Sequence, residues 1–355
     1  MTRPVLQQIT RGLLALSLST VMATTGLAAA TAADTSRPVQ HAVVLVSGTA
    51  ATTPFTTPTQ ACTSGYSAGN TWGYLRDYLV QRGYQVYTAP ASVGGVTVTE
   101  TKDPYSGPFS DCPAQLPAPL TINAIGSVDQ SGANLARFIR YLGTQYGVTS
   151  VDVVGHSLGG LIGRAGIREV KLGDVPVSVT SYTTLGSPWD GTVVANLDPR
   201  KPLSGCDGSK VCEGFITSLL TVPGIQMLIA SLGVQNEPVW NQGQIGVLDG
   251  VPVTLIAGTY FTRKGGDPRR WPNDAVIERR SALARATPDA VIPHRTCVTF
   301  PLTHSIFVSK VLGIADSKAL TWNPQVGAAL ERALDGAATA LTGPNRVGCP
   351  TPPKS

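Results

Sequence analysis

The sequence predicts an α/β fold, in which a mostly parallel central sheet is flanked by helices on both faces. Short β-branched or apolar runs alternate along the chain with longer runs of helical spacing. A glycine-rich turn at 155–160 joins one strand-like run directly to a helix-like run. A long stretch, 190–250, separates two expected strands by more residues than one helix needs. These three observations indicate one α/β domain that carries an insertion.

The expected elements follow from local patterns of apolar residues and from turn residues between them. Thr71 is a suitable cap for the first helix, and Gly83 ends it. The stretches 53–70 and 89–120 are rich in Thr, Pro or Gly and are expected to be irregular. We expect strands at 41–47, 84–88, 151–154, 177–185, 253–260 and, as the last strand, 296–300, and helices at 72–81, 132–146, 158–171 and 324–341.

The first 33 residues have the features of a secretory signal peptide. Arg3 and Arg11 precede an apolar stretch that ends in Ala-rich sequence, with small residues suited to cleavage. A membrane anchor is the alternative, but Ser and Thr residues dilute the apolar run. We therefore expect a secreted protein, without stable membrane insertion, whose mature part 34–355 is a single domain.

The charge balance argues against nucleic acid as a partner. The chain has 27 Lys and Arg against 22 Asp and Glu, and its net charge falls from +5 to +3 without residues 1–33. No basic tract is long enough to follow a phosphate backbone. A chain of this length buries a sizeable core by itself, and we expect a monomer.

The cysteines favour disulfides in an oxidising compartment. All six lie beyond residue 33, and no C-x-x-C motif points to zinc or redox chemistry. Fifteen pairings are possible, and only the short Cys206–Cys212 loop follows from spacing. Sequence order suggests the three pairs Cys62–Cys112, Cys206–Cys212 and Cys297–Cys349.

The insertion at 190–250 contains a stretch, 214–233, without a charged residue. A buried helix pair broken at Pro223-Gly224 is one interpretation of this stretch. A transmembrane span is disfavoured by the same proline and glycine. Because long insertions in compact domains are usually functional, we expect a cap or lid over the active site.

Ser157 is the candidate nucleophile. It lies in Gly155-His156-Ser157-Leu158-Gly159, a G-x-S-x-G sequence between an expected strand and an expected helix. This layout is typical of a nucleophile elbow, in which a strained turn exposes the serine hydroxyl. A structural turn serine is the alternative interpretation.

A serine nucleophile needs a base and an orienting acid, and both can be sought by position. His304 follows the 296–300 strand and so lies at the carboxyl edge of the sheet, where such sites form, whereas His294 precedes it. The acid should follow the 253–260 strand. Asp274 suits this position best. Asp289 is nearer the opposite edge, and Asp267 lies in a basic turn, 263–270, expected to be solvated.

Two backbone N–H groups are candidates for stabilising an oxyanion. One belongs to Leu158, directly after the nucleophile, and the other to Thr49, after the first expected strand. Gly48 permits a close backbone approach, and the Thr49 hydroxyl is a further donor. An ordinary loop threonine is the alternative interpretation of Thr49.

Three blocks of sequence resemble secreted bacterial lipases of the α/β-hydrolase superfamily. These are residues 43–49, residues 155–161 with Arg164, and residues 184–188 with Gly191-Thr192, and the resemblance covers about 41–310. It implies an α/β-hydrolase fold and ester hydrolysis with Ser157, Asp274 and His304 as the triad. It also implies Thr49 and Leu158 as the substrate-binding oxyanion hole. We expect no cofactor and no metal ion.

Two departures bear on the subfamily. Ser47-Gly48 replaces the His-Gly of many such lipases, and Gly48-Thr49 is instead similar to the fungal lipase-B type. Trp189-Asp190 replaces a histidine after Ser-Pro, and we interpret Asp190 as structural, as a cap or a salt-bridge partner. A calcium ligand is the alternative, although nothing in the spacing demands it.

The functional hypotheses differ in substrate and in class. The first is a lipase that acts on acylglycerols, with activity rising at an oil–water interface. The second is an esterase or acyltransferase that acts on short-chain, soluble or cell-envelope esters, and an amidase is also compatible with the triad. A catalytically silent binding protein is the third, and it is disfavoured because all three triad residues are present.

Overall fold

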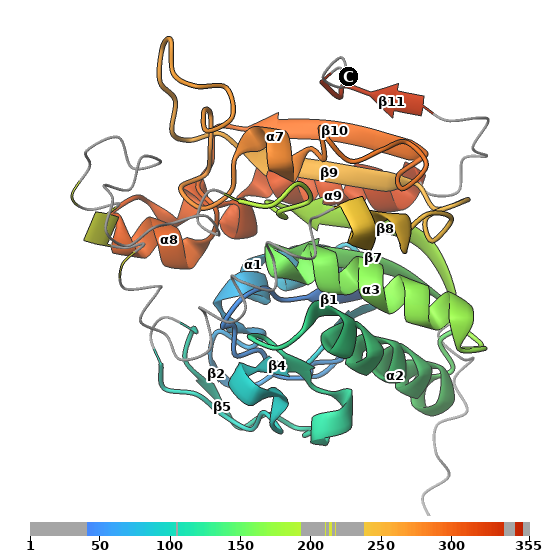
Figure 1. The fold of residues 1–355 in the computed structure, drawn as a ribbon. Coiled ribbons are helices and arrows are strands. Elements are labelled where there is room, and N and C mark those ends of the chain that lie inside the picture. Colours follow the sequence, from blue (N-terminus) through green and yellow to red (C-terminus); the bar gives the residue numbers. More distant parts are fainter. Residues whose placement is uncertain are drawn as a thin grey trace, which may run out of the picture. The chain divides into compact units, whose positions relative to one another are not determined.

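The computed structural model describes residues 41–103, 106–192, 238–336 and 345–350, together with positions 210, 213, 214 and 217 (Figure 1). Three expectations therefore lie outside the described residues. They are the signal peptide at 1–33, the Cys206–Cys212 disulfide and most of the cap at 190–250.

The core of the fold is a seven-stranded sheet in which every neighbouring pair of strands is parallel. Its spatial order is β11-β10-β9-β8-β7-β1-β3. The predicted parallel α/β architecture is thus confirmed. The strands are β1 (His41–Val46), β3 (Val86–Thr88), β7 (Ser150–His156), β8 (Ser178–Leu185), β9 (Val253–Gly258), β10 (His294–Phe300) and β11 (Asn345–Val347).

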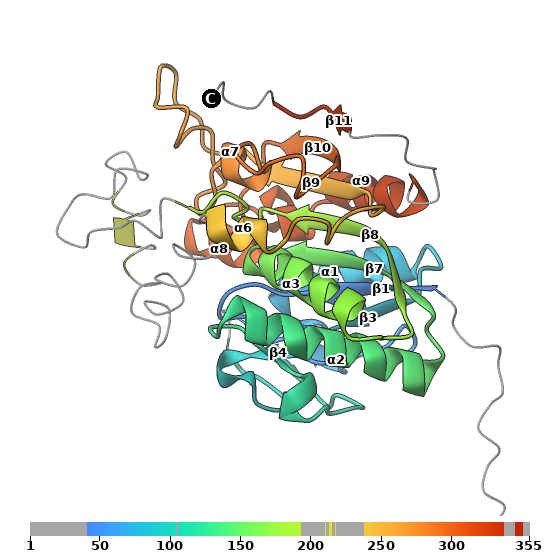
Figure 2. The same ribbon diagram turned by 45° about the vertical axis from the view of Figure 1, so that its right-hand side comes forward.

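Helices cover both faces of this sheet (Figures 1 and 2). Leu135 and Leu161 of α2 and α3 belong to the core on one face, and Trp72 and Leu330 of α1 and α9 to the core on the other. Because each helix places its apolar stripe on the sheet, both faces are sealed from water. The helices are α1 (Gly69–Val80), α2 (Val128–Tyr146), α3 (Leu158–Leu172), α6 (Pro238–Gln242), α7 (Arg279–Ala282), α8 (Ile306–Val311) and α9 (Pro324–Gly336).

The strand order changes direction beside β1. Ligand sites in parallel α/β sheets form at the carboxyl ends of the strands where the order changes. The chain passes from β1 through α1 to β3 on one side, whereas β7 lies on the other side and leads through α3 to β8. The α/β-hydrolase fold places its reactive groups above the carboxyl ends of such strands. Residues 47–49 and 157–158 follow β1 and β7 at this edge.

Several expected boundaries are corrected. Helix α1 begins at Gly69 after Ala68, so Thr71 is not its cap. Helix α2 begins at Val128 and is capped by Ser127, whose hydroxyl accepts a hydrogen bond from the Gln130 N–H at 3.5 Å. The loops at 53–70 and 89–120 contain short elements, namely β2 (Ser64–Gly65), β4 (Ala91–Ser92), β5 (Phe109–Ser110) and two 3₁₀ turns, and a further short strand, β6 (Ile122–Asn123), follows them.

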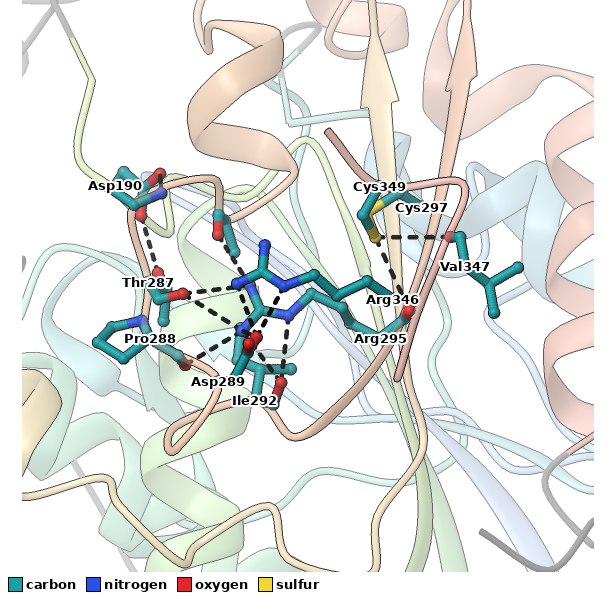
Figure 3. Close-up of polar contacts among 12 residues, drawn as sticks. Asp190, Thr287, Pro288, Asp289, Ile292, Arg295, Cys297, Arg346, Val347 and Cys349 are labelled. Atoms are coloured by element: carbon teal, nitrogen blue, oxygen red, sulfur yellow. Dashed lines mark hydrogen bonds and ion pairs between the residues drawn. A yellow bond between two sulfur atoms is a disulfide. The ribbon is translucent and has the colours of Figure 1, made fainter. Parts of the chain in front are cut away.

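The expectation that 296–300 is the last strand is wrong, because β11 adds a further parallel strand beside β10. The expected disulfides Cys62–Cys112 and Cys297–Cys349 are both present, and the second ties β10 to the chain just after β11. Asp289 adds a second tie, since its Oδ1 accepts hydrogen bonds from Arg295 at 3.2 Å and Arg346 at 2.6 Å (Figure 3). A three-residue strand alone has too few pairings to stay attached, and these ties hold it.

A histidine–aspartate pair joins the amino ends of β1 and β7. His41 Nε2 donates to Asp152 Oδ2 at 2.7 Å, and Asp152 Oδ1 accepts from the hydroxyls of Thr180 and Ser181 at 2.7 and 2.6 Å. Asp152 is buried, while the His41 side chain is 47 % exposed. The hydrogen bond to Asp152 raises the pKa of His41 above its ordinary value of 6.5, although burial opposes this.

We expect this pair to make stability depend on pH. A pKa raised in the folded state means that His41 stabilises the protein below pH 6.5, and that this stabilisation is lost as pH rises through the raised pKa. The effect should be at most about 1 kcal/mol, because the His41 side chain of the pair is half exposed to solvent. The free energies of urea unfolding of wild type and His41→Gln should differ at about pH 5.5 and converge at about pH 8.5. A difference that is constant across this range would contradict the assignment.

Candidate active site

Ser157 lies at a sharp turn between β7 and α3. Its φ of 55° and ψ of −130° are rare for a residue with a Cβ, and such a conformation costs roughly 1–3 kcal/mol. The flanking glycines give the turn its space. A Cβ on Gly155 would lie 2.5 Å from the Gly159 oxygen, and one on Gly159 would strike the Val46 carbonyl. The expected strand–turn–helix elbow with small flanking residues is therefore present.

Asp274 and His304 form a hydrogen-bonded pair at the same edge of the sheet. His304 Nδ1 donates to Asp274 Oδ2 at 2.8 Å, and the His304 N–H donates to the Asp274 carbonyl at 2.9 Å. The other carboxylate oxygen accepts the N–H groups of Val276 and Ile277 at 2.9 and 2.7 Å. Asp274 is fully buried. Its Oδ2 thus remains for the imidazole, which holds the proton on Nδ1 and leaves Nε2 as an acceptor.

The three expected triad residues meet around Leu185 and Gly186. The Ser157 N–H donates to the Leu185 carbonyl at 2.9 Å. Gly186 has φ +56°, and a Cβ there would lie 2.9 Å from Asp274 Oδ2 and 3.0 Å from His304 Nδ1. Only a glycine combines this conformation with this clearance. The Gly-Ser-Pro turn after β8 therefore makes room for the acid and the base beside the elbow.

His156 is a site residue that the sequence assigned only to the elbow motif. Its Nε2 donates to the His304 carbonyl at 2.9 Å, and the two rings lie 4.6 Å apart between centroids. Burial, with the nearby His304 second, lowers the pKa of His156 well below its ordinary value. A neutral, fixed His156 therefore positions the His304 main chain. The G-x-S-x-G motif contains His156, but it gives no signal of the hydrogen bond to the distant His304.

The loop after β1 lies against the elbow. A Cβ on Gly48 would come within 2.6 Å of Ser157 Cβ and 3.2 Å of the Leu158 nitrogen. The half-buried Thr49 follows directly. The residues expected to donate to an oxyanion, Thr49 and Leu158, therefore belong to two segments that the fold brings into contact.

This contact supports a prediction about Gly48. Gly48→Ala should lower kcat/KM of ester hydrolysis about 100-fold. The added methyl group would push the elbow away by up to about 1 Å, and a nucleophile misplaced by that distance reacts more slowly. Gly336→Ala is the control, since a Cβ there meets nothing within 4 Å and activity should be unchanged. A Gly48→Ala enzyme with wild-type kcat/KM would show that the 48–49 loop is not part of the site.

The alternative acids and base lie elsewhere. His294 is the first residue of β10, at the opposite end of that strand from His304. Asp289 is paired with Arg295 and Arg346 (Figure 3). Asp267 is paired with the exposed Arg269. Of the weighed candidates, Asp274 and His304 are the two that the fold brings to the elbow.

Arg164 and Asp190, two further residues noted in the sequence, make contacts that hold the fold together. Arg164 is fully buried, with its guanidinium 4.4 Å from the Trp189 ring and 4.2 Å from the Trp240 ring, and burial lowers its pKa to about 9. Asp190 accepts hydrogen bonds from the Ala286 N–H and the Thr287 hydroxyl, so it ties two loops together.

Two other kinds of feature are absent from the described part of the chain. No cluster of three or more His, Cys, Asp or Glu side chains is arranged to hold a metal ion there. Within the same residues, no helix combines the length and the apolar character that a membrane crossing requires.

Comparisons with known proteins point to serine hydrolases. Residues 121–200, which include the elbow, match the family described as "Putative serine esterase (DUF676)". No curated protein matches the sequence significantly.

Solved structures with a similar arrangement include three proteins of low sequence identity. A gene product of Listeria innocua is 17 % identical, with 87 % of this chain and 98 % of that chain covered and a TM-score of 0.42. A lipase-esterase related protein of Clostridium acetobutylicum is 15 % identical, with 82 % and 94 % covered and a TM-score of 0.40. An esterase of Pyrococcus furiosus is 16 % identical, with 84 % of each chain covered and a TM-score of 0.38.

The sequence match and the geometry of the elbow agree. The segment that matches the serine esterase family contains the strained serine, and the sheet that carries it has the strand order and helix layers described above. The chain is a serine hydrolase with an α/β-hydrolase fold.

Proposed function

We propose that the protein is a secreted carboxylic-ester hydrolase that forms an acyl-enzyme on Ser157. The observation that carries this proposal is the buried His304–Asp274 pair beside the strained serine. Ser157 Oγ attacks the ester carbonyl while His304 Nε2 takes its proton. Asp274 holds the imidazole tautomer and stabilises the cation. His304 then protonates the leaving alcohol, and water releases the acid by the same steps.

The negative charge that develops on the carbonyl oxygen needs donors that are already in place. The N–H groups of Leu158 and Thr49 fill this role in the proposal. Leu158 N–H is at the first turn of α3, where helix N–H groups have no partner within the helix. Among the described residues, no backbone acceptor pairs with the Thr49 N–H outside regular elements. We therefore assign both N–H groups to the oxyanion in this proposal.

Acylglycerols are the proposed substrates, so that the protein acts as a lipase. Support comes from the sequence alone, because the stretch 214–233 has no charged residue and lies between β8 and β9, which flank the site. An apolar segment at this point in the chain suits a long acyl chain. Secretion is proposed from residues 1–33, and the two disulfides are compatible with an oxidising compartment.

A series of p-nitrophenyl esters from acetate to palmitate tests this proposal. We expect kcat/KM to rise about fourfold with each methylene that the acyl site buries, until the site is full. Hydrolysis restricted to the shortest esters would favour the esterase alternative over the lipase. No hydrolysis of any ester by folded protein would contradict the proposed function altogether.

A further inference from the structure

The loop that leads from β9 to the Asp274 segment is closed at its base and projects beyond it. Reciprocal backbone hydrogen bonds of 3.0 Å between Phe261 and Asn273 close the base, one residue before Asp274. We call residues 262–272 the basic loop. Figures 1 and 2 show this loop, in light orange beside α7, standing out near the end of the sheet toward which the β10 arrow points.

The basic loop carries a net charge as large as that of residues 34–355 together. It has four cations, Arg263, Lys264, Arg269 and Arg270, against one acid, Asp267, which gives +3. Residues 34–355 together also carry +3, so the rest of that part sums to zero. The loop therefore concentrates four cations in a short segment of the chain.

Three of the four cations of the basic loop are exposed to solvent, and Arg270 is half-buried. Arg263 and Lys264 are exposed, and the Arg269 side chain is 76 % exposed. Asp267 is held by Arg269 at 3.1 Å, so the only acid of the loop is already paired within the loop. Exposed Arg279 extends the cationic surface, since its N–H donates to the Pro272 carbonyl at the loop base.

Aromatic side chains accompany these cations. Tyr260 is 37 % exposed and packs against Phe261, with 5.0 Å between ring centroids. Trp271 is half-buried and lies across the loop, because a Cβ on Gly266 would lie 2.7 Å from its Cδ1. Aromatic rings beside Lys and Arg are the composition that favours the interface between water and lipid headgroups.

We propose that the basic loop docks the protein on an anionic lipid surface and so presents the Ser157 site to substrate in that surface. The charge of the loop selects anionic headgroups, and its place next to Asp274 ties docking to the site. This inference deepens the proposed function and rests on it for the identity of the substrate. Docking itself needs no catalysis, so it can be tested apart from hydrolysis.

The test uses the full chain with Ser157→Ala, so that the lipid stays intact, and measures co-sedimentation with vesicles at low salt. We expect binding to vesicles of phosphatidylcholine with phosphatidylglycerol, little binding to phosphatidylcholine alone, and release by added salt. The triple variant Arg263→Gln, Lys264→Gln, Arg270→Gln, which keeps the Arg269–Asp267 pair, should bind anionic vesicles about 100-fold more weakly.

A matched control distinguishes an effect of the basic loop from an effect of the total charge of the protein. Lys102→Gln, Arg140→Gln, Lys171→Gln removes three other exposed cations and should change binding only slightly. Equal losses in the two triple variants would overturn the proposal. So would an absence of binding to anionic vesicles by the parent protein. A loop-dependent binding to heparin without binding to vesicles would also overturn it and identify a soluble polyanion as the partner.

Soluble-ester hydrolysis distinguishes the two proposals. The loop variant with Ser157 intact should hydrolyse p-nitrophenyl butyrate at the wild-type rate, because its three substitutions lie outside the proposed triad and oxyanion hole. If the triple variant does not fold, Lys264→Glu alone, on an exposed side chain, should weaken vesicle binding about 30-fold. Wild-type hydrolysis of soluble ester without vesicle binding would reject docking and retain the proposed function.

Discussion

Ser157→Ala should lower kcat for ester hydrolysis by about 10⁵–10⁶-fold and leave a folded protein. The substitution removes the hydroxyl that would form the acyl-enzyme, so the remaining groups only bind and polarise the ester. Removing Oγ relieves none of the turn strain, because alanine still has a Cβ at φ 55°. The thermal midpoint should therefore stay close to that of wild type. Initial rates on p-nitrophenyl butyrate and labelling by a fluorophosphonate measure the effect.

Ser187→Ala is the matched control for this substitution. Ser187 is also buried at the carboxyl edge of the sheet, and its Oγ pairs with no group in the described part of the chain. Its removal should leave both the rate and the labelling unchanged. Labelling that persists in Ser157→Ala but disappears in Ser187→Ala would transfer the nucleophile role to Ser187. Labelling in neither wild type nor variants would speak for a silent binding protein.

Asp274→Asn should lower kcat about 10⁴-fold with KM little changed. The carboxylate accepts two backbone N–H groups with Oδ1, so an asparagine keeps its oxygen there and turns its NH₂ group toward His304. His304 Nδ1 must then accept, and the ring proton moves to Nε2. An imidazole with a proton on Nε2 cannot take the serine proton. The steady-state kinetics of the variant measure this loss.

Asp289→Asn is the control that carries the same chemical change. Asp289 pairs with Arg295 and Arg346 and is half exposed, so its loss should weaken the attachment of β11 and lower thermal stability. Hydrolysis measured well below the unfolding temperature should be unaffected. The reverse outcome, with activity lost in Asp289→Asn and kept in Asp274→Asn, would restore Asp289 as the candidate acid.

Local patterns in the sequence were sufficient to predict the type and the order of the main strands and helices. The alternation of β-branched runs with helical spacing predicted β1, β3, β7, β8, β9 and β10 and the helices α1, α2, α3 and α9, whereas the shorter helices α6, α7 and α8 were not predicted. These signals are local, because side chains repeat every second residue in a strand and about every fourth in a helix. The boundaries were less well determined. Helix α2 begins at Val128, before the apolar spacing becomes regular, because Ser127 caps it there.

Strand β11 was missed for a related reason. Its three residues, Asn345–Val347, have no apolar periodicity, and the segment is held in the sheet by the Cys297–Cys349 disulfide and by Asp289. Such partners lie about 50 residues away in sequence. Pairing of this kind is a property of the folded chain, which no local window contains.

The sequence alone determined the elbow, because the glycines at 155 and 159 and the strand and helix around them are neighbours in the chain. It also narrowed the acid and base to a few candidates by their order relative to the strands. Only the tertiary structure shows which of these candidates lie together, since β8, β9 and β10 must align before Asp274 and His304 can pair beside Gly186. The physical reason is the distance along the chain over which each interaction acts. A turn depends on adjacent residues, whereas the clearance at Gly186 and the His156–His304 contact depend on segments over 80 residues apart.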